Sequence, residues 1–154
     1  MYLKFCGFKR KEDVLKAIEL PIDAIGFIHF PNSHRHRDMS QIQQLTKLVP
    51  SYIDRVVVLV NPDRTQIQSV VSHTQINTIQ FHGNEPIEII KWTRTQYPNI
   101  KIFKALPAHQ DLLDHIDYYK QLVDLFIIDT PSEQFGGTGQ IYDWHLLDLS
   151  LIHI

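Results

Sequence analysis

The chain has 154 residues, the size of a single domain. Its 15 Lys and Arg residues against 17 Asp and Glu give a formal charge of −2, so it lacks the basic surface typical of proteins that bind nucleic acid or anionic membranes. A single Cys excludes an internal disulfide and a Cys-rich zinc site. With neither a signal peptide nor an apolar run approaching the roughly 20 residues that span a bilayer, we expect a cytoplasmic protein with no membrane partner.

Six short apolar, β-branched runs alternate with longer amphipathic segments. The runs cover residues 3–6, 24–29, 55–60, 78–81, 101–105 and 125–129. Most lack polar alternation, which is typical of parallel strands covered on both faces. The runs begin on average about 24 residues apart, the length of one strand followed by one helix.

The segments between the runs are predicted to be helices. They cover residues 11–19, 41–48, 62–71, 86–97 and 111–122. Ser40 is the predicted N-cap of the second helix, and Pro62 suits the first turn of the third. Pro, Gly and Asn residues mark the junctions.

Six successive strand–helix units predict a parallel α/β fold. Two architectures fit this pattern, an open doubly wound sheet and a (β/α)₈ barrel, and the pattern alone does not separate them. The sequence has neither G-x-G-x-x-G nor G-x-x-x-x-G-K-[ST], which disfavours a nucleotide-binding site. In either architecture, functional side chains collect at the C-terminal ends of the strands.

Two candidate catalytic residues follow from that rule. Cys6 ends the first run, and it is either a buried strand Cys or a thiolate that acts as base or nucleophile. Asp129 ends the sixth run, where a carboxylate is costly to bury without a partner. Asp129 is either a general acid kept protonated by apolar surroundings or a turn or N-cap carboxylate.

The segment after the second run is rich in Arg and His. Arg35 or Arg37 suits bidentate binding of a carboxylate. His29, His34 and His36 lie in the same segment, but their spacing fits no standard zinc pattern, so we expect no metal.

Two further segments follow strand ends. His82 follows the fourth run, where it either lines a site or hydrogen-bonds the next loop. Gly137 and Gly139 belong to a Gly-rich segment after the sixth run. Such segments can hold anions through backbone N–H groups, although this signal is weak by itself.

Several motifs occur in a fixed order along the chain. They are KFCG at 4–7, DAIGFIHFPNSHR at 23–35, VNPD at 60–63, INTIQFHGNE at 76–85, and IIDT followed by GGTGQIYDW, which ends at Trp144. Together they resemble the phosphoribosylanthranilate isomerase family, (β/α)₈-barrel (TIM-barrel) enzymes of tryptophan biosynthesis. The resemblance covers nearly the whole chain.

The resemblance implies an Amadori rearrangement of N-(5′-phosphoribosyl)anthranilate to 1-(o-carboxyphenylamino)-1-deoxyribulose 5-phosphate, with no cofactor or metal. Asp129 matches the general acid that protonates the ribose ring oxygen, and Cys6 matches the general base that removes the C2′ proton. Arg35 matches the arginine that pairs with the anthranilate carboxylate. The residues His82, Gly137 and Gly139 fall in motifs around the mouth and are assigned to substrate binding. The expected partner is this small molecule alone, and the native enzyme is expected to be a monomer or homodimer.

The sequence departs from the family at its C-terminal end. Two further units of about 24 residues each are needed for eight strands, and nothing after Trp144 matches the family's phosphate-binding loops. We therefore expect an incomplete TIM barrel over residues 1–147, with about six of eight units, and a truncated or non-native tail over 148–154. The fragment itself is expected to be inactive. The alternative from another class is a non-catalytic open-sheet α/β binding module.

Overall fold

Six strands form one parallel sheet in the computed structural model, which describes residues 2–129. The strands are β1 (Lys4–Cys6), β2 (Ala24–Ile28), β3 (Asp54–Leu59), β4 (Thr78–Phe81), β5 (Lys101–Pro107) and β6 (Leu125–Asp129). The helices are α1 (Lys11–Ala17), α2 (Met39–Thr46), α3 (Arg64–His73), α4 (Ile87–Gln96) and α5 (Leu112–Tyr119). Each strand pairs with the next one along the chain.

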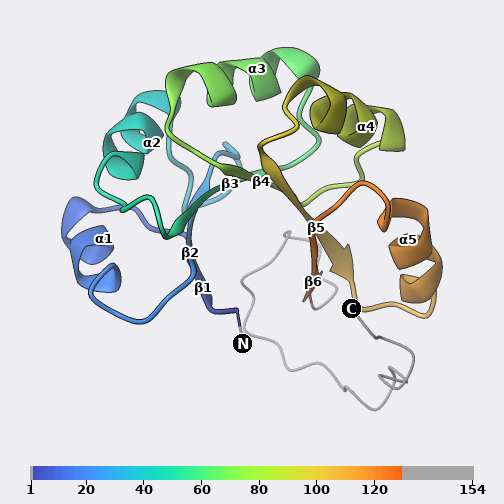
Figure 1. The fold of residues 1–154 in the computed structure, drawn as a ribbon, viewed down its shortest axis with the longest axis horizontal. Helices are drawn as coiled ribbons and strands as arrows, with labels where there is room; N and C mark the ends of the chain where they lie inside the picture. The colour runs from blue at the N-terminus through green and yellow to red at the C-terminus, as the bar shows by residue number, and fades with distance from the viewer. Residues whose placement is uncertain (1, 130–154) are drawn as a thin grey trace.

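The sheet curves, and the five helices lie along its convex face (Figure 1). A doubly wound sheet would carry helices on both faces. Sequential strand order with helices on one side is instead the arrangement of a (β/α)₈ barrel, here with six strands and five helices in the described residues. The expected incomplete barrel is therefore confirmed, and the doubly wound alternative is wrong.

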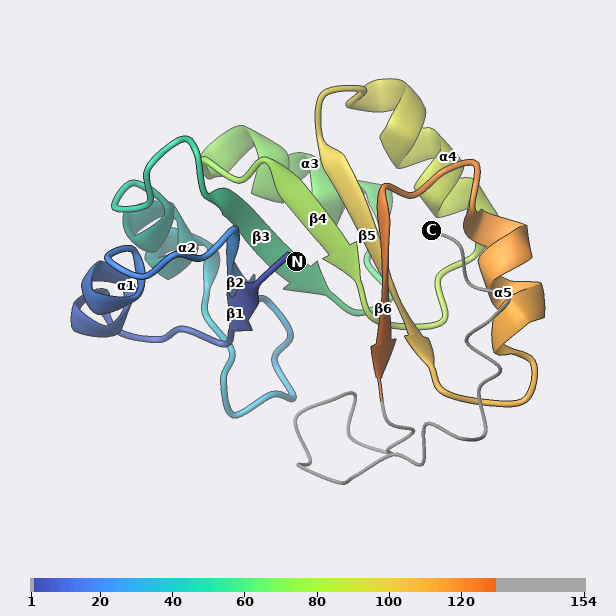
Figure 2. The same cartoon turned by 60° about the horizontal axis from the view of Figure 1, so that its bottom comes forward.

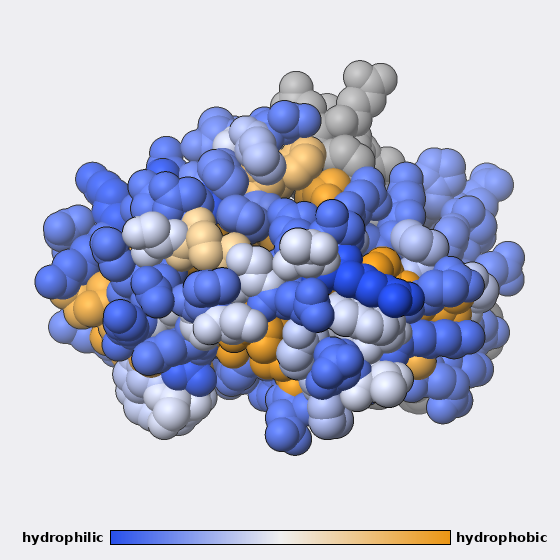
Figure 3. All heavy atoms as spheres, turned by 90° about the horizontal axis from the view of Figure 1, so that it is seen from above, coloured by the Kyte–Doolittle hydropathy of each residue, from blue (hydrophilic) through white to orange (hydrophobic). Residues whose placement is uncertain are grey.

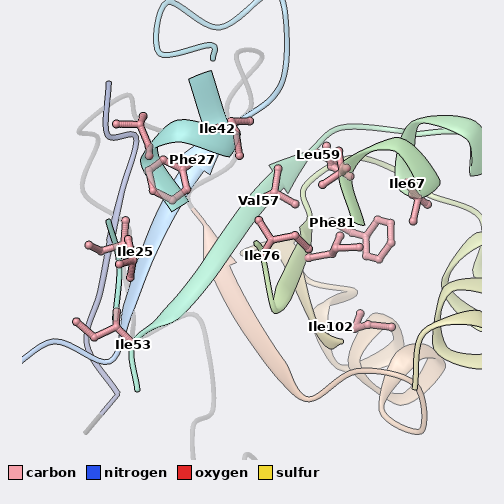
Figure 4. Close-up of a cluster of buried hydrophobic side chains, with 14 of the residues drawn as sticks. Ile25, Phe27, Ile42, Ile53, Val57, Leu59, Ile67, Ile76, Phe81 and Ile102 are labelled. Carbon is pink, nitrogen blue, oxygen red and sulfur yellow. The ribbon is translucent and has the colours of Figure 1, made fainter. Parts of the chain in front are cut away.

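The main hydrophobic core lies between the sheet and the helices. Figure 4 shows strand side chains such as Phe27 and Leu59 on the same side as Ile42 of α2 and Ile67 of α3. All four are fully buried. Burial of one such side chain contributes about 1.5–3 kcal/mol, so this layer is the main source of stability.

The concave face of the sheet carries a smaller cluster. Ala24, Val56 and Phe103 are buried together there, with Leu125 and Ile127 packed against them. Successive strand residues point to opposite faces, so these residues alternate with those of the outer core. In a barrel this face is the interior, and its side chains at the C-terminal ends of the strands surround the active site.

Asp54 lies on the concave face at the N-terminal ends of the strands. It accepts hydrogen bonds from Tyr2 Oη at 2.6 Å, Lys101 Nζ at 2.7 and 2.9 Å, and Asn77 Nδ2 at 3.0 Å. Strands β3 and β5 are thus joined to the segment before β1. This cluster lies at the opposite end of the sheet from the candidate catalytic residues.

Two helices have an aspartate N-cap just before their first residue, which differs from the starts that the sequence analysis predicted. Asp38, not Ser40, caps α2: its carboxylate accepts from Gln41 N at 2.8 Å, and the Gln41 side chain accepts from Asp38 N at 3.0 Å. Asp63 caps α3 through Gln66 N, so Pro62 precedes the helix. A carboxylate is a strong acceptor at a helix N-terminus, where it also meets the positive end of the helix dipole.

The surface seen in Figure 3 is mostly hydrophilic, with separate apolar spots. Within residues 2–129, the most exposed large apolar side chains are Tyr52, Tyr118 and Leu20. No helix of this part of the chain is long and apolar enough to cross a membrane.

Candidate active site

Four predicted site residues lie where strands end. Cys6 is the last residue of β1 and Asp129 the last of β6, while His82 follows β4 and Arg35 belongs to the loop after β2. Parallel strands bring all these ends to one edge of the sheet, and Figure 2 shows the arrowheads of β5 and β6 directed to the same end. Gly137 and Gly139 lie outside the described residues.

His82 is hydrogen-bonded to Asp129. Its Nε2 lies 3.1 Å from Asp129 Oδ2, although the two residues are 47 positions apart. The hydrogen bond therefore connects the end of β4 with the end of β6, although β5 lies between these two strands in the sheet. Burial lowers the pKa of His82 more than the nearby Asp129 carboxylate raises it, so the imidazole is neutral at neutral pH.

Gln80 extends this contact further into the sheet. It lies in β4 two residues before His82, so both side chains point to the concave face. Its side-chain nitrogen lies 3.1 Å from His82 Nδ1, and the residue is 3% exposed. The sequence analysis missed Gln80, although the two-residue spacing at a strand end was a signal that could have found it.

Cys6 is exposed, so the interpretation as a buried strand residue is wrong. It is paired with Gly26 of β2, and the missing side chain of Gly26 makes room for it. A Cβ atom at Gly26 would lie 2.6 Å from Cys6 Sγ and 3.1 Å from Lys4 Nζ. The thiol and the Lys4 ammonium therefore approach the same point above Gly26, which the sequence analysis did not foresee.

Arg35 lies against Gly7, the residue after Cys6. Gly7 has a φ of +89°, and a Cβ atom there would lie 2.7 Å from Arg35 Cδ and 3.1 Å from its Nη1. Glycine is needed for both the positive φ and this close approach. Arg35 Nε is buried and has no hydrogen-bond partner among the described residues. A guanidinium is thus held against the residue that directly follows Cys6.

His29, His36 and Arg37 of this segment lie close together. The rings of His29 and His36 lie 5.3 Å apart, and His29 Nδ1 is 2.9 Å from Arg37 O. Burial, and secondarily the nearby His29, lowers the pKa of His36. In residues 2–129 there is no group of three or more His, Cys, Asp and Glu side chains that could hold a metal ion.

A buried ion pair fixes the loop that follows His82. Lys104 Nζ lies 3.0 Å from Glu85 Oε2 and donates to Gly83 O at 2.7 Å. Glu85 Oε1 accepts from the backbone nitrogens of Gly83 at 2.8 Å and Asn61 at 3.1 Å. The chain segments after β3 and β4 are thereby tied to β5. The sequence analysis missed this pair, although a Lys within an apolar strand was a signal.

Comparison with known proteins agrees with this arrangement. The family model for N-(5′-phosphoribosyl)anthranilate (PRA) isomerase matches residues 3–152. The chain belongs to the PRA isomerase family. A PRA isomerase from Staphylococcus aureus is 55% identical over 147 residues, which are 96% of this chain and 70% of that protein.

Solved PRA isomerase structures have the same fold. The crystal structure of the enzyme from Thermotoga maritima has 31% sequence identity and a TM-score of 0.81, over 95% of this chain and 69% of that one. A PRA isomerase structure in complex with reduced 1-(o-carboxyphenylamino)-1-deoxyribulose 5-phosphate has 29% identity and a TM-score of 0.76, over 86% and 66% of the two chains. The predicted isomerase class, TIM-barrel fold and place in tryptophan biosynthesis are therefore confirmed.

Proposed function

We propose that the strand-end residues of this chain isomerise N-(5′-phosphoribosyl)anthranilate, with Asp129 as general acid and Cys6 as general base. The observation that carries the proposal is the position of both groups, each the last residue of its strand, at one edge of a parallel sheet. That edge is the catalytic end in barrels of this kind.

The two groups suit the two proton transfers of the reaction. Asp129 gives a proton to the ribose ring oxygen as the bond from that oxygen to C1′ breaks, which leaves an iminium ion. Cys6 then takes the proton from C2′, and the resulting enolamine tautomerises to the ketone. A well-placed acid or base typically contributes about 10²–10⁴-fold to the rate.

Arg35 is proposed to bind the anthranilate carboxylate. Its guanidinium lies against Gly7, and its Nε has no partner among residues 2–129, so donors remain for an anion. Guanidinium and carboxylate groups pair well because two parallel N–H donors match two oxygens. His82 is proposed to support substrate binding beside Asp129. For Gly137 and Gly139 a binding role stays a prediction.

Because the chain spans 70% of the Staphylococcus aureus relative, the decisive assay uses a chimera as well as the chain itself. The chimera joins residues 1–129 of this chain to the remaining part of that relative. We expect it to consume phosphoribosylanthranilate in a fluorescence assay, and we expect Cys6→Ser and Asp129→Asn each to lower turnover by about 10²–10⁴-fold. Asp117→Asn, at an aspartate whose side chain is 73% exposed, should leave turnover unchanged.

The result that overturns the assignment is a folded chimera whose turnover survives loss of either the thiol or the carboxyl. The same assay on the 154-residue chain tests the expectation that it is inactive. Binding of the reduced product analogue to that chain, lost in Arg35→Met, tests the anthranilate contact without requiring turnover.

A further inference from the structure

Three side chains on the concave face form a line that ends at the proposed acid. Gln80 Nε2 lies 3.1 Å from His82 Nδ1, and His82 Nε2 lies 3.1 Å from Asp129 Oδ2. Gln80 is 3% exposed and the His82 side chain 17%. The contact between Gln80 and His82 is therefore largely shielded from water, whereas the Asp129 side chain is 32% exposed. The direction of each hydrogen bond depends on which ring nitrogen of His82 carries the proton.

The donors and acceptors decide that question. An amide NH₂ group can only donate, so His82 Nδ1 must accept from Gln80 with its lone pair. The neutral ring then carries its hydrogen on Nε2, which donates to Asp129 Oδ2. Each atom along the line thus has a matching partner.

The reverse arrangement satisfies fewer groups. If the Gln80 amide were turned over, its carbonyl would accept from Nδ1–H, and Nε2 would need a proton from Asp129. Both amide N–H donors of Gln80 would then be buried at the position where, among the described residues, Gln80 Oε1 now has no hydrogen-bond partner. Among the described residues, either orientation leaves two hydrogen-bonding positions of Gln80 unpaired: Oε1 and one N–H as observed, or both N–H groups when the amide is turned over. The difference therefore lies at His82 Nε2, whose lone pair would face a carboxylate oxygen of Asp129 in the reverse arrangement, whereas the Nε2–H tautomer donates to that oxygen.

We propose that Gln80 is a positioning residue that selects the Nε2–H tautomer of His82, which in turn holds Asp129 through Oδ2. A proton on Oδ2 would face the Nε2–H group, so protonated Asp129 carries its proton on Oδ1. The catalytic part of the inference rests on the proposed function of Asp129, whereas the tautomer does not.

The neutral state of the ring follows from its burial. Burial lowers the pKa of His82, with a smaller contribution from the Lys104 ammonium, while Asp129 and Glu85 act in the opposite direction. A Gln80→Glu substitution keeps the size of the side chain but places a second carboxylate at Nδ1. That change should protonate both ring nitrogens at a pH where the native ring is neutral.

Long-range ¹H–¹⁵N spectra of the ¹⁵N-histidine-labelled 154-residue chain test the proposal, because the ring nitrogen shifts separate the two tautomers from the imidazolium ion. The His82 signals are identified by their loss in His82→Gln. At neutral pH we expect the Nε2–H pattern in the native chain and the imidazolium pattern in Gln80→Glu. Gln96→Met, at an exposed glutamine of α4, should leave the native pattern unchanged.

Two further variants show which partner selects the tautomer. Asp129→Asn should keep the Nε2–H pattern, because Gln80 still donates to Nδ1, and Gln80→Met in that background should give a mixture of both tautomers. An Nδ1–H or imidazolium pattern in the native chain at neutral pH overturns the proposal, as does loss of the Nε2–H pattern in Asp129→Asn alone. No substrate is present, so failure of the isomerase assignment would leave this result unaffected.

Discussion

Lys104 and Glu85 form an ion pair with almost no access to solvent. Lys104 Nζ lies 3.0 Å from Glu85 Oε2, and the two side chains are 3% and 0% exposed. The carboxylate also accepts hydrogen bonds from the backbone nitrogens of Gly83 and Asn61. The backbone oxygen of Glu85 accepts a further hydrogen bond from Tyr119 Oη at 3.0 Å. The pair therefore holds the turn directly after His82, so its integrity bears on the site as well as on stability.

Lys104→Met should destabilise the chain strongly. The substitution leaves the Glu85 carboxylate buried without its cation, and breaking a buried pair from one side costs about 3–5 kcal/mol. Urea unfolding, monitored by circular dichroism, measures the loss of unfolding free energy. The double variant Lys104→Met with Glu85→Gln should recover part of it, because no buried charge remains.

An exposed ion pair provides the matched control. Lys120 and Asp117 lie 2.9 Å apart with side chains 54% and 73% exposed. Lys120→Met should therefore change the free energy of unfolding by less than about 1 kcal/mol. If Lys104→Met and Lys120→Met lowered the free energy of unfolding equally, burial of the ion pair would not determine the cost of breaking it.

Gly26→Ala should be destabilising because of Cys6. The added methyl group would lie 2.6 Å from Cys6 Sγ, and overpacking of this kind costs about 1–3 kcal/mol. A double-mutant cycle with Cys6→Ala isolates the contact, since removing the sulfur makes room for the methyl group. We expect Gly26→Ala to cost less in the Cys6→Ala background. An identical cost in both backgrounds would mean that the thiol does not occupy the space above Gly26.

Much of the strand layout could be predicted from sequence. Residues 78–81 and 125–129 were predicted with the bounds that β4 and β6 have, because apolar runs without polar alternation are typical of parallel strands. The common edge for Cys6 and Asp129 followed from the same pattern, since parallel strands end together. These features depend on local composition and on one rule of topology.

The remaining features depend on contacts between distant residues. The sequence shows Gln80 and His82 two positions apart, but not that Asp129 meets the other side of the ring. Nothing local separates an exposed Cys6 from a buried one, because its exposure depends on which elements cover β1. The N-cap of α2 is Asp38 rather than Ser40, because two residues that make good N-caps compete here and only the folded chain decides between them.

Gly7→Ala should affect both stability and the proposed anthranilate contact. Alanine at a φ of +89° is strained, and such backbone strain costs about 1–3 kcal/mol. The new Cβ atom would also lie 2.7 Å from Arg35 Cδ and displace the guanidinium. We expect weaker binding of the reduced product analogue by calorimetry. In the Arg35→Ala background the strain should persist but the additional loss of binding should not, and binding unaffected by Gly7→Ala would contradict the proposed position of Arg35.

Asp54 should make the stability of the chain sensitive to acid. Burial raises the pKa of its carboxyl, but hydrogen bonds from Lys101, Tyr2 and Asn77 outweigh burial, so the net pKa lies below the ordinary value of 3.8. A group whose pKa is lowered by folding contributes stability at pH values above its unfolded pKa, and this contribution disappears as the pH falls through the folded pKa. The free energy of unfolding should therefore decrease below about pH 4 more steeply in the native chain than in Asp54→Asn.

Urea titrations at pH 7 and at pH 3 measure the difference, with the exposed Asp117→Asn variant expected to follow the native chain. Parallel pH profiles for the native chain and Asp54→Asn would show that the carboxylate does not stabilise the N-terminal end of the sheet.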